Sequence, residues 1–292
     1  MKKFLPSIIA EGFISSNPIP SKEELEIYYK EEFYQSEKPS QINDSSKEIR
    51  DRDSTFYNLQ YSIFSHLLDL KNSVSHADLG CGYGHFLQYI ANIFSNKKNY
   101  GCEVYPEASS YIESIKNTTF IEFDLNNMNK CFDLLGDCTT YSLINTLEHL
   151  QDPKLFLKEI YNSMNYGNKL LLQVPNDFNP IQKSAVKELK LNEWWFCPPR
   201  HISYFSPLGL KNLCESLGFK CIEMITTFPI DMFLLCGLNY REEPNLGRKA
   251  HVMRTLFEKN YINTHGLEGL LDLYRNFANA NIGREIIIVL SK

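Results

Sequence analysis

The chain has 292 residues, of which 43% are hydrophobic and 22% charged, a globular composition that excludes a collagen, a coiled coil and a largely disordered chain. At roughly 150 residues per domain, this length allows about two domains or one elaborated α/β domain. Thirty Lys and Arg against thirty-five Asp and Glu give a net charge of −5, with no basic block. Because nucleic-acid-binding proteins usually carry a basic surface, we expect no nucleic-acid partner.

The sequence predicts a chain without a membrane span, since it contains no apolar stretch of about 18 residues or more. The N-terminal residues resemble a signal peptide only briefly, because Pro6 and Glu11 interrupt the apolar run, and we interpret them as mature sequence. Eight cysteines form neither C-x-x-C pairs nor a Cys/His metal pattern, and most lie within apolar runs. This pattern predicts a reducing, cytoplasmic location.

The N-terminal part of the chain predicts a helical cap over residues 1–72. Ser21 and Glu24 form a capping box, and aromatic residues then recur at helical spacing. Residues 35–53 are polar and predict a loop. A second helical pattern covers residues 56–68.

From residue 73 onward, short apolar runs alternate with helical patterns. The apolar runs cover residues 74–79, 99–104, 118–123, 139–145, 168–174, 219–226 and 285–290, and the helical patterns cover 85–95, 106–116, 153–165 and 206–218. The alternation predicts βα units around a parallel sheet, with residues 73–226 as the core domain. Residues 227–283 contain two more helical patterns, around 248–259 and 266–278, and predict a helical insertion before a last core strand in 284–292.

A glycine-rich loop follows the first predicted strand of the core, with the sequence Asp78-Leu79-Gly80-Cys81-Gly82-Tyr83-Gly84. Its glycines allow the backbone to approach a ligand closely. The third glycine comes one residue too early for a dinucleotide fingerprint, which argues against NAD. Asp78 would repel a pyrophosphate but attract an ammonium or sulfonium group, so the loop predicts a cationic, nucleotide-like ligand.

Two further acids follow the next two predicted strands. Glu103 lies 103 − 82 = 21 residues after the middle glycine, where an acid accepts hydrogen bonds from ribose hydroxyls in this topology. Asp124, next to Leu125, ends the following strand and is suited to accept a hydrogen bond from an adenine amino group. Taken singly, these acids are as well explained as turn or surface residues. In this order, they predict an adenosine-binding crevice.

With these motifs, the sequence resembles the class I S-adenosylmethionine-dependent methyltransferases over about residues 74–226 together with 285–290. The segments 142–153 and 201–206 are similar to the subgroup that includes ubiquinone-biosynthesis and sugar O-methyltransferases. The resemblance implies a Rossmann-like α/β sheet of seven strands, the last antiparallel, and S-adenosyl-L-methionine as cofactor. We expect the cofactor to be bound by Asp78, Gly80, Gly82, Gly84, Glu103, Asp124, Leu125 and Asn145.

The sequence differs from the ubiquinone-type members of the family at one position. In those members a carboxylate joins a Glu-His pair in holding a divalent metal, whereas this chain has Asn145 ahead of Glu148 and His149. Because an uncharged amide is a weaker ligand than a carboxylate, we expect no metal.

Methyl transfer is a displacement that needs positioning and exclusion of water more than catalytic groups. For a hydroxyl acceptor, His201 and then His149 are the candidate bases, with a rate that falls below an imidazole pKa of about 6.5. The alternative is structural: His201 ties its own loop to the sheet, and His149 bonds the loop before Pro153.

The sequence leads us to a methyltransferase acting on a small-molecule hydroxyl, with a sugar nucleotide or surface-polysaccharide precursor as the acceptor. Tyr29 and Trp194 belong to aromatic groups that form either a lid or plain packing, and Arg241 and its basic neighbours bind a diphosphate or are simply solvated. The alternatives are a quinone-pathway or other small-acceptor methyltransferase, and a non-catalytic binding subunit with this fold. The oligomeric state stays open, a homo-oligomer included.

Overall fold

The computed structural model describes residues 3–10, 12–29, 31, 47–124, 134–135 and 138–292, with only the backbone of residues 47–55. No helix in these described ranges is long and apolar enough to cross a membrane. The seven cysteines that they include are all free thiols.

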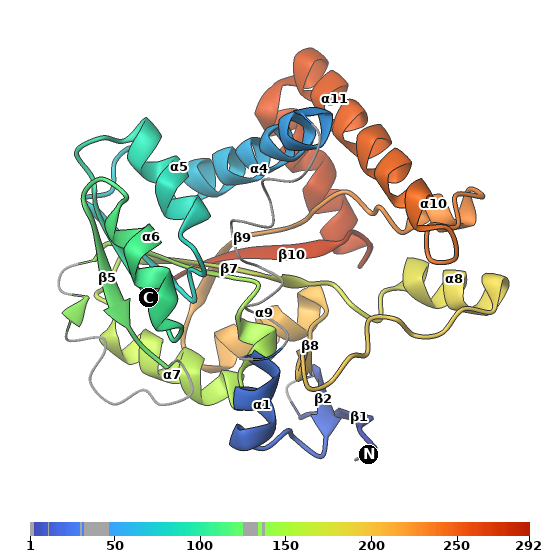
Figure 1. Ribbon diagram of the computed structural model, residues 1–292, viewed down its shortest axis with the longest axis horizontal. Helices are drawn as coiled ribbons and strands as arrows, with labels where there is room; N and C mark the ends of the chain where they lie inside the picture. Colours follow the sequence, from blue (N-terminus) through green and yellow to red (C-terminus); the bar gives the residue numbers. More distant parts are fainter. Residues whose placement is uncertain (1–2, 11, 30, 32–46, 125–133, 136–137) are drawn as a thin grey trace.

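A seven-stranded sheet forms the centre of the molecule (Figure 1). From one edge to the other, its strands are β5 (Thr118–Glu122), β4 (Lys98–Glu103), β3 (Ser75–Leu79), β6 (Thr140–Ile144), β7 (Lys169–Pro175), β10 (Glu285–Ser291) and β9 (Lys220–Thr226). Strands β3 to β7 pair in parallel, whereas β10 is antiparallel to both β7 and β9. The predicted α/β fold, with seven strands and an antiparallel last strand, is confirmed.

Helices cover both faces of this sheet (Figure 1). On one face lie α4 (Lys47–Leu67), α5 (His85–Ile93) and α11 (Pro244–Asn279); on the other lie α7 (Pro153–Ser163) and α9 (Pro207–Ser216). The described residues also form shorter helices: α1 (Lys22–Tyr28), η2 (Pro106–Ala108), α6 (Ser109–Glu113), η4 (Leu147–His149), α8 (Pro180–Leu189) and α10 (Met232–Leu235).

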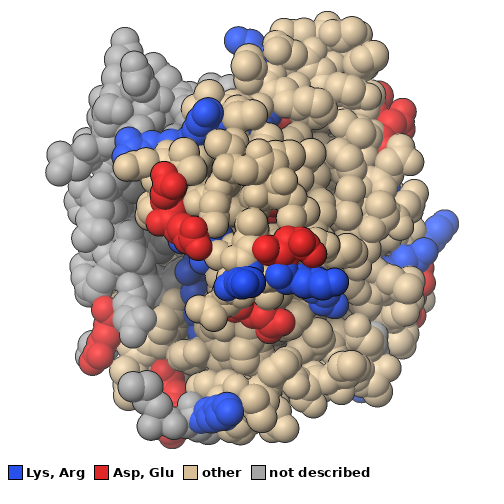
Figure 2. Space-filling model, turned by 90° about the vertical axis from the view of Figure 1, so that its right-hand side faces the viewer, with Lys and Arg blue, Asp and Glu red and all other residues tan. Residues whose placement is uncertain are grey.

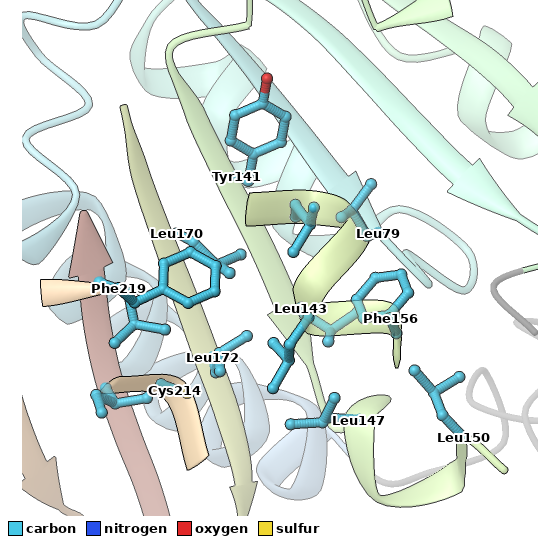
Figure 3. Packing of buried hydrophobic residues seen from close by; sticks show 14 of the residues in the cluster. Leu79, Tyr141, Leu143, Leu147, Leu150, Phe156, Leu170, Leu172, Cys214 and Phe219 are labelled. Carbon is cyan, nitrogen blue, oxygen red and sulfur yellow. The ribbon is translucent and has the colours of Figure 1, made fainter. Parts of the chain in front are cut away.

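Two large hydrophobic clusters lie on opposite faces of the sheet, and a smaller one lies between α5 and the η2–α6 segment. Because successive strand side chains point to opposite faces, Leu170 and Leu172 belong to one cluster and Leu171 to the other. Figure 3 shows side chains of β6 and β7 gathered with Phe156 of α7 in the first cluster. Leu270 of α11 packs in the second cluster, so the segment before β10 lies directly on the sheet. The domain boundaries given above stay predictions.

A second, three-stranded sheet was not predicted. It joins β1 (Leu5–Ile8), β2 (Ile14–Asn17) and β8 (Ser203–Tyr204), with β2 antiparallel to both neighbours. Strands of two to four residues are too short to give a readable alternation, which explains why the sequence did not reveal them.

Three other details differ from the predictions. Residues 47–53 are helical rather than a loop, because Lys, Glu and Arg are polar but also good helix formers; residues 32–46 lie outside the described ranges. The segment 106–116 forms η2 and the five-residue α6 instead of one helix. The two late helical patterns form α11, which is broken at Gly266 by a φ of 71°.

Candidate active site

A cavity of about 440 Å³ opens at the carboxyl edge of the sheet, where β3 lies between β4 and β6. The chain order reverses at this point, which is where open α/β sheets bind their ligands. Of the predicted site residues, the cavity is lined by Asp78, Gly80, Gly82, Glu103, Asp124, Asn145, His149 and His201. Gly84 is not among its lining residues, and Leu125 lies outside the described ranges.

The three glycines of the loop have different roles. All have positive φ, but a Cβ at Gly80 would lie 2.5 Å from the Thr146 side chain, whereas a Cβ at Gly82 would meet nothing within 4 Å. Gly80 is therefore required by packing, and Gly82 turns bare backbone toward open space, as close approach of a ligand requires. Gly84 precedes α5, and a Cβ there would lie 2.9 Å from Ile115.

Glu103 is held in place by the loop that it faces. One carboxylate oxygen accepts a hydrogen bond from Gly82 N at 2.8 Å, and the other accepts one from Val104 N at 2.8 Å. These two bonds fix the carboxylate at the edge of the cavity, and each of its oxygens has two acceptor sites. The arrangement suits a pair of ribose hydroxyls.

Asp78 is buried at the floor of the cavity and accepts a hydrogen bond from Ser142 Oγ at 2.5 Å. Burial raises the pKa of Asp78 to about 7, and the neighbouring charge of Glu103 adds to the rise. A positively charged ligand would favour the ionised form of Asp78.

Glu148, His149 and His201 meet at the other end of the cavity, with one ligand-type atom of each within 4.8 Å of the others. The Nδ1–H of His149 donates to the Arg200 carbonyl at 2.5 Å, so Nδ1 carries the hydrogen of the neutral ring, and Nε2 lies 3.7 Å from Glu148 Oε1. Burial and the nearby His201 lower the pKa of His149 to about 3, so this imidazole is neutral near pH 7.

His201 has the opposite electrostatic surroundings. Its Nδ1 lies 3.8 Å from Asp177 Oδ2. Burial lowers the pKa of His201, but the side chains of Asp177 and Cys197 outweigh this effect and raise it to about 10. The ring is therefore a cation at neutral pH, unlike the base with an ordinary imidazole pKa that the sequence suggested.

Arg284 places a second cation beside Asp177. Its Nη1 donates to Asp177 Oδ1 at 2.9 Å, and it lines the cavity together with Arg200. Burial raises the pKa of Glu148 to about 8, so this carboxyl is mostly protonated near pH 7. Arg284 Nε also lies 3.7 Å from Oε1 of Glu285, whose pKa is likewise raised by burial. Three cations, Arg200, His201 and Arg284, thus lie at this end of the cavity.

Asn145 is positioned by a chain of amides. Its Oδ1 accepts a hydrogen bond from Gln173 Nε2 at 3.1 Å, and Gln173 in turn accepts one from Gln60 Nε2 at 2.7 Å. Oδ1 is the metal-ligating atom of an Asn side chain, and here it is already engaged. This geometry agrees with the expectation of no metal at Asn145, which stays a prediction.

Several cavity residues were missed because no local motif marks them. Arg200, Arg284 and Tyr61 reach the cavity only through the tertiary fold. Ser142, which bonds Asp78 from the neighbouring strand, carries no sequence signal of its own. Tyr29, named above in an aromatic group, lies over the cavity with its ring centroid 6.3 Å from that of His149.

Comparison with known families identifies the chain. A family model described as "Methyltransferase domain" matches residues 56–224, more than half of the sequence. This chain is a member of that methyltransferase family. Its cofactor is S-adenosylmethionine, as the resemblance implied.

A curated relative is a tRNA U34 carboxymethyltransferase of Sulfurovum sp. (strain NBC37-1). It is 23% identical over 186 residues, which cover 60% of this chain and 56% of the relative, so the match spans little more than half of that protein.

Solved methyltransferase structures share the fold. The plantazolicin methyltransferase BpumL, in complex with a monoazolic desmethylPZN analog and SAH, gives a TM-score of 0.53 at 15% identity over 92% of this chain and 93% of that one. Coclaurine N-methyltransferase, bound to N-methylheliamine and SAH, gives 0.51 at 15% identity over 80% of this chain and 71% of that one. The [4+2]-cyclase SpnF also gives 0.51, at 11% identity over 80% and 81%. Because a cyclase shares it, the fold alone does not determine the reaction.

The cavity residues fit the cofactor. The volume lies in the usual range for small-molecule sites, the backbone at Gly82 faces open space, and two buried acids suit a ribose and a positive charge.

Proposed function

We propose that the protein transfers a methyl group from S-adenosylmethionine to a hydroxyl of a small, anionic acceptor, with a sugar nucleotide or a related polysaccharide precursor as the class that fits best. The observation that carries this proposal is the unequal charge of the two ends of the cavity. Acids at one end match a cationic cofactor, and cations at the other match an acceptor with phosphate or carboxylate groups.

The cofactor end comprises Asp78, Glu103 and Asp124 around the glycine loop. We assign Glu103 to the ribose hydroxyls, Asp124 to the adenine amino group and Asp78 to the positive charge of the methionine part. Glycines Gly80 and Gly82 shape the loop, and Asn145 lines the cavity beside it.

The acceptor end comprises Arg200, His201 and Arg284. A smaller hollow of about 160 Å³ shares Arg284 with the main cavity and is also lined by Trp194 and Arg241. The guanidinium carbon of Arg241 lies 4.9 Å from the centroid of the Trp194 ring. An aromatic surface next to two guanidinium groups suits a phosphate joined to a planar or sugar group.

The bound cofactor supplies an activated methyl group, and the protein's own residues hold the acceptor and manage its proton. Cationic His201 stabilises negative charge that develops on the acceptor oxygen. Neutral His149 then accepts the hydroxyl proton at Nε2, while its Nδ1–H stays bonded to the Arg200 carbonyl. His201 and His149 thus both act in the reaction, with His149 rather than His201 as the base.

Other acceptors define the alternatives. A quinone-pathway phenol would carry no phosphate and would leave Arg241 and Arg284 without a ligand. The tRNA substrate in the name of the Sulfurovum relative raises a nucleic-acid acceptor. On the face toward α8 and α10, basic and acidic side chains lie intermixed in a narrow band instead of a continuous basic surface (Figure 2). This face supports a small acceptor, as does the net charge of −5.

The test uses the full chain and the tritiated methyl donor. Calorimetry is expected to detect binding of S-adenosylmethionine and SAH but not of NAD, and label is expected in one or more nucleotide sugars from a mixed pool. Parallel reactions contain a hydroquinone and bulk tRNA. Label only in the hydroquinone or only in tRNA would contradict the proposed acceptor, and label in none with tight cofactor binding would favour the non-catalytic alternative.

A further inference from the structure

A chain of buried polar side chains runs from the cavity floor into the sheet. Ser142 Oγ lies 2.5 Å from Asp78 Oδ1 and 3.0 Å from His76 Nε2, and His76 Nδ1 lies 3.1 Å from Thr140 Oγ1. Thr140 Oγ1 also lies 2.9 Å from the Ser75 carbonyl oxygen. The four side chains, which we call the Asp78 relay, are 0–3% exposed. They come from the neighbouring strands β3 and β6.

The hydrogen bonds of the relay can run in two directions. With Asp78 protonated, its O–H donates to Ser142, Ser142 donates to His76 Nε2, and Nδ1–H donates to Thr140. With Asp78 ionised, Ser142 donates to Asp78, His76 Nε2–H donates to Ser142, and Thr140 donates to Nδ1. His76 is neutral in both arrangements and differs only in which nitrogen carries the hydrogen.

Neither arrangement leaves a buried donor without an acceptor. In the first, the Thr140 hydroxyl donates to the Ser75 carbonyl. In the second it turns to His76, and the Ser75 carbonyl keeps the hydroxyl of Thr139, 3.2 Å away. A network that is satisfied in two states allows Asp78 to gain or lose a proton without the cost of an unpaired buried group.

We propose that the Asp78 relay is a two-state device in which binding of cationic S-adenosylmethionine ionises Asp78, releases one proton to solvent and shifts the hydrogen of His76 from Nδ1 to Nε2. His76 is then a positioning residue, because it acts on the cofactor through Ser142 and Asp78. The inference rests on the cofactor end of the proposed site.

The surroundings of the relay support a neutral His76 and a titrating Asp78. Asp78 faces Glu103 of β4, Tyr61 of α4 and the thiol of Cys81, and the buried carboxyl has a pKa of about 7. Burial and the charge of Lys97 lower the pKa of His76 to about 3, and the edge of the Phe86 ring covers it on the α5 side. His76 therefore does not compete with Asp78 for the proton, and the other two members of the relay are neutral hydroxyls.

The first experiment observes the tautomer of His76 directly, without and then with the cofactor. In the ¹⁵N spectrum of the free protein, the His76 signals, assigned with His76→Gln, should exchange between the two tautomers over about pH 6–8 without forming an imidazolium. Saturating S-adenosylmethionine should give the Nε2–H form already at about pH 6. One unchanged tautomer under all these conditions overturns the proposal, as does a cationic His76.

The second experiment measures cofactor affinity against pH by calorimetry, with proton release obtained from buffers of different ionisation enthalpy. The parent should release about half a proton near pH 7, and Asp78→Asn should release none. Ser142→Ala removes the hydrogen bond that favours ionised Asp78 and should move the midpoint of the pH profile up by about one pH unit. Thr140→Val leaves His76 Nδ1–H without an acceptor in the protonated arrangement. It should therefore move the midpoint of the pH profile down by a similar amount.

Tyr141→Phe is the matched control, because Tyr141 lies between Thr140 and Ser142 on β6 but its buried hydroxyl donates to the Cys138 carbonyl, outside the relay, and it should leave the midpoint unchanged. Shifts of Ser142→Ala and Thr140→Val in the same direction, or an equal shift in the control, would refute the relay. If the His76 tautomer changes with pH in the free protein but neither the parent nor any variant binds the cofactor, the result contradicts the proposed cofactor site and not the relay.

Discussion

Single side chains at the two ends of the cavity divide the work by charge. At the cofactor end, the charge of Glu103 adds to the effect of burial in raising the pKa of Asp78. At the acceptor end, His201 and Arg284 flank Asp177 and hold its pKa below the usual range despite burial. A cationic cofactor and an anionic acceptor would each enter the end that complements its charge.

Glu103 allows the cofactor assignment to be tested. Glu103→Ala should weaken S-adenosylmethionine binding by about ten-fold or more, since charge-assisted hydrogen bonds contribute about 1.5–3 kcal/mol. Glu122→Ala is the control, because Glu122 pairs with Glu103 in register on β5 but is exposed. Equal affinity of the two variants, measured by calorimetry, would place the ribose elsewhere.

His201 gives a prediction with a defined pH window. Its folded pKa of about 10 lies above the ordinary value of 6.5, so the proton stabilises the fold fully below about pH 6.5 and this contribution is lost as the pH rises toward 10. In urea unfolding, the stability difference between the parent and His201→Gln should shrink over this range. A difference that grows with pH would mean that His201 is not a cation in the folded protein.

The same side chain also determines the pH dependence of catalysis. At saturating cofactor, turnover should not fall near pH 6.5, because His149 stays neutral down to about pH 3 and His201 stays charged. His201→Ala should lower turnover by about 10²-fold with cofactor affinity unchanged. A fall in the parent rate centred near pH 6.5 would restore His201 as the base.

Among the elements, those with strong local signals were predicted and those defined by distant contacts were not. The capping box at Ser21 is present, and Ser206-Pro207 begins α9 as expected. Asn179-Pro180 carries the same kind of start signal for α8 and was overlooked. The loop acids were found because motif and spacing are local, whereas Arg284 reaches the cavity only because β10 returns antiparallel beside β7.

The turn between β3 and α5 is the element in which sequence and function are most tightly linked. Gly80→Ala would force a Cβ against Thr146 at positive φ, so we expect a lower melting temperature and at least about ten-fold weaker cofactor binding. Gly82→Ala has open space around the added carbon and should mainly lose affinity, with a smaller change in melting temperature. Calorimetry and thermal unfolding of both variants test this order, and equal losses of melting temperature would contradict it.

For the molecule as a whole, the acceptor end depends on the N-terminal sheet. Strand β2 pairs with β8, and the Phe13 ring stacks on Phe205 at 5.1 Å. The Tyr204 hydroxyl donates to the His201 carbonyl at 2.8 Å and accepts from Cys197 N at 3.1 Å. The cofactor end rests on β3 and β4 within the central sheet and does not require this attachment.

A variant without residues 1–20 should therefore separate the two ends of the site. We expect cofactor affinity within about two-fold of the parent, faster hydrogen exchange at residues 200–205 and a turnover lower by about ten-fold or more, because β8 loses its partner strand. Phe13→Ala in the full chain tests the same link if the shortened protein folds poorly, since deleting a buried ring costs about 3–5 kcal/mol locally. Leu5→Ala, at a side chain that is 53% exposed, is the control. Loss of cofactor affinity in step with turnover would show that the two ends are not independent.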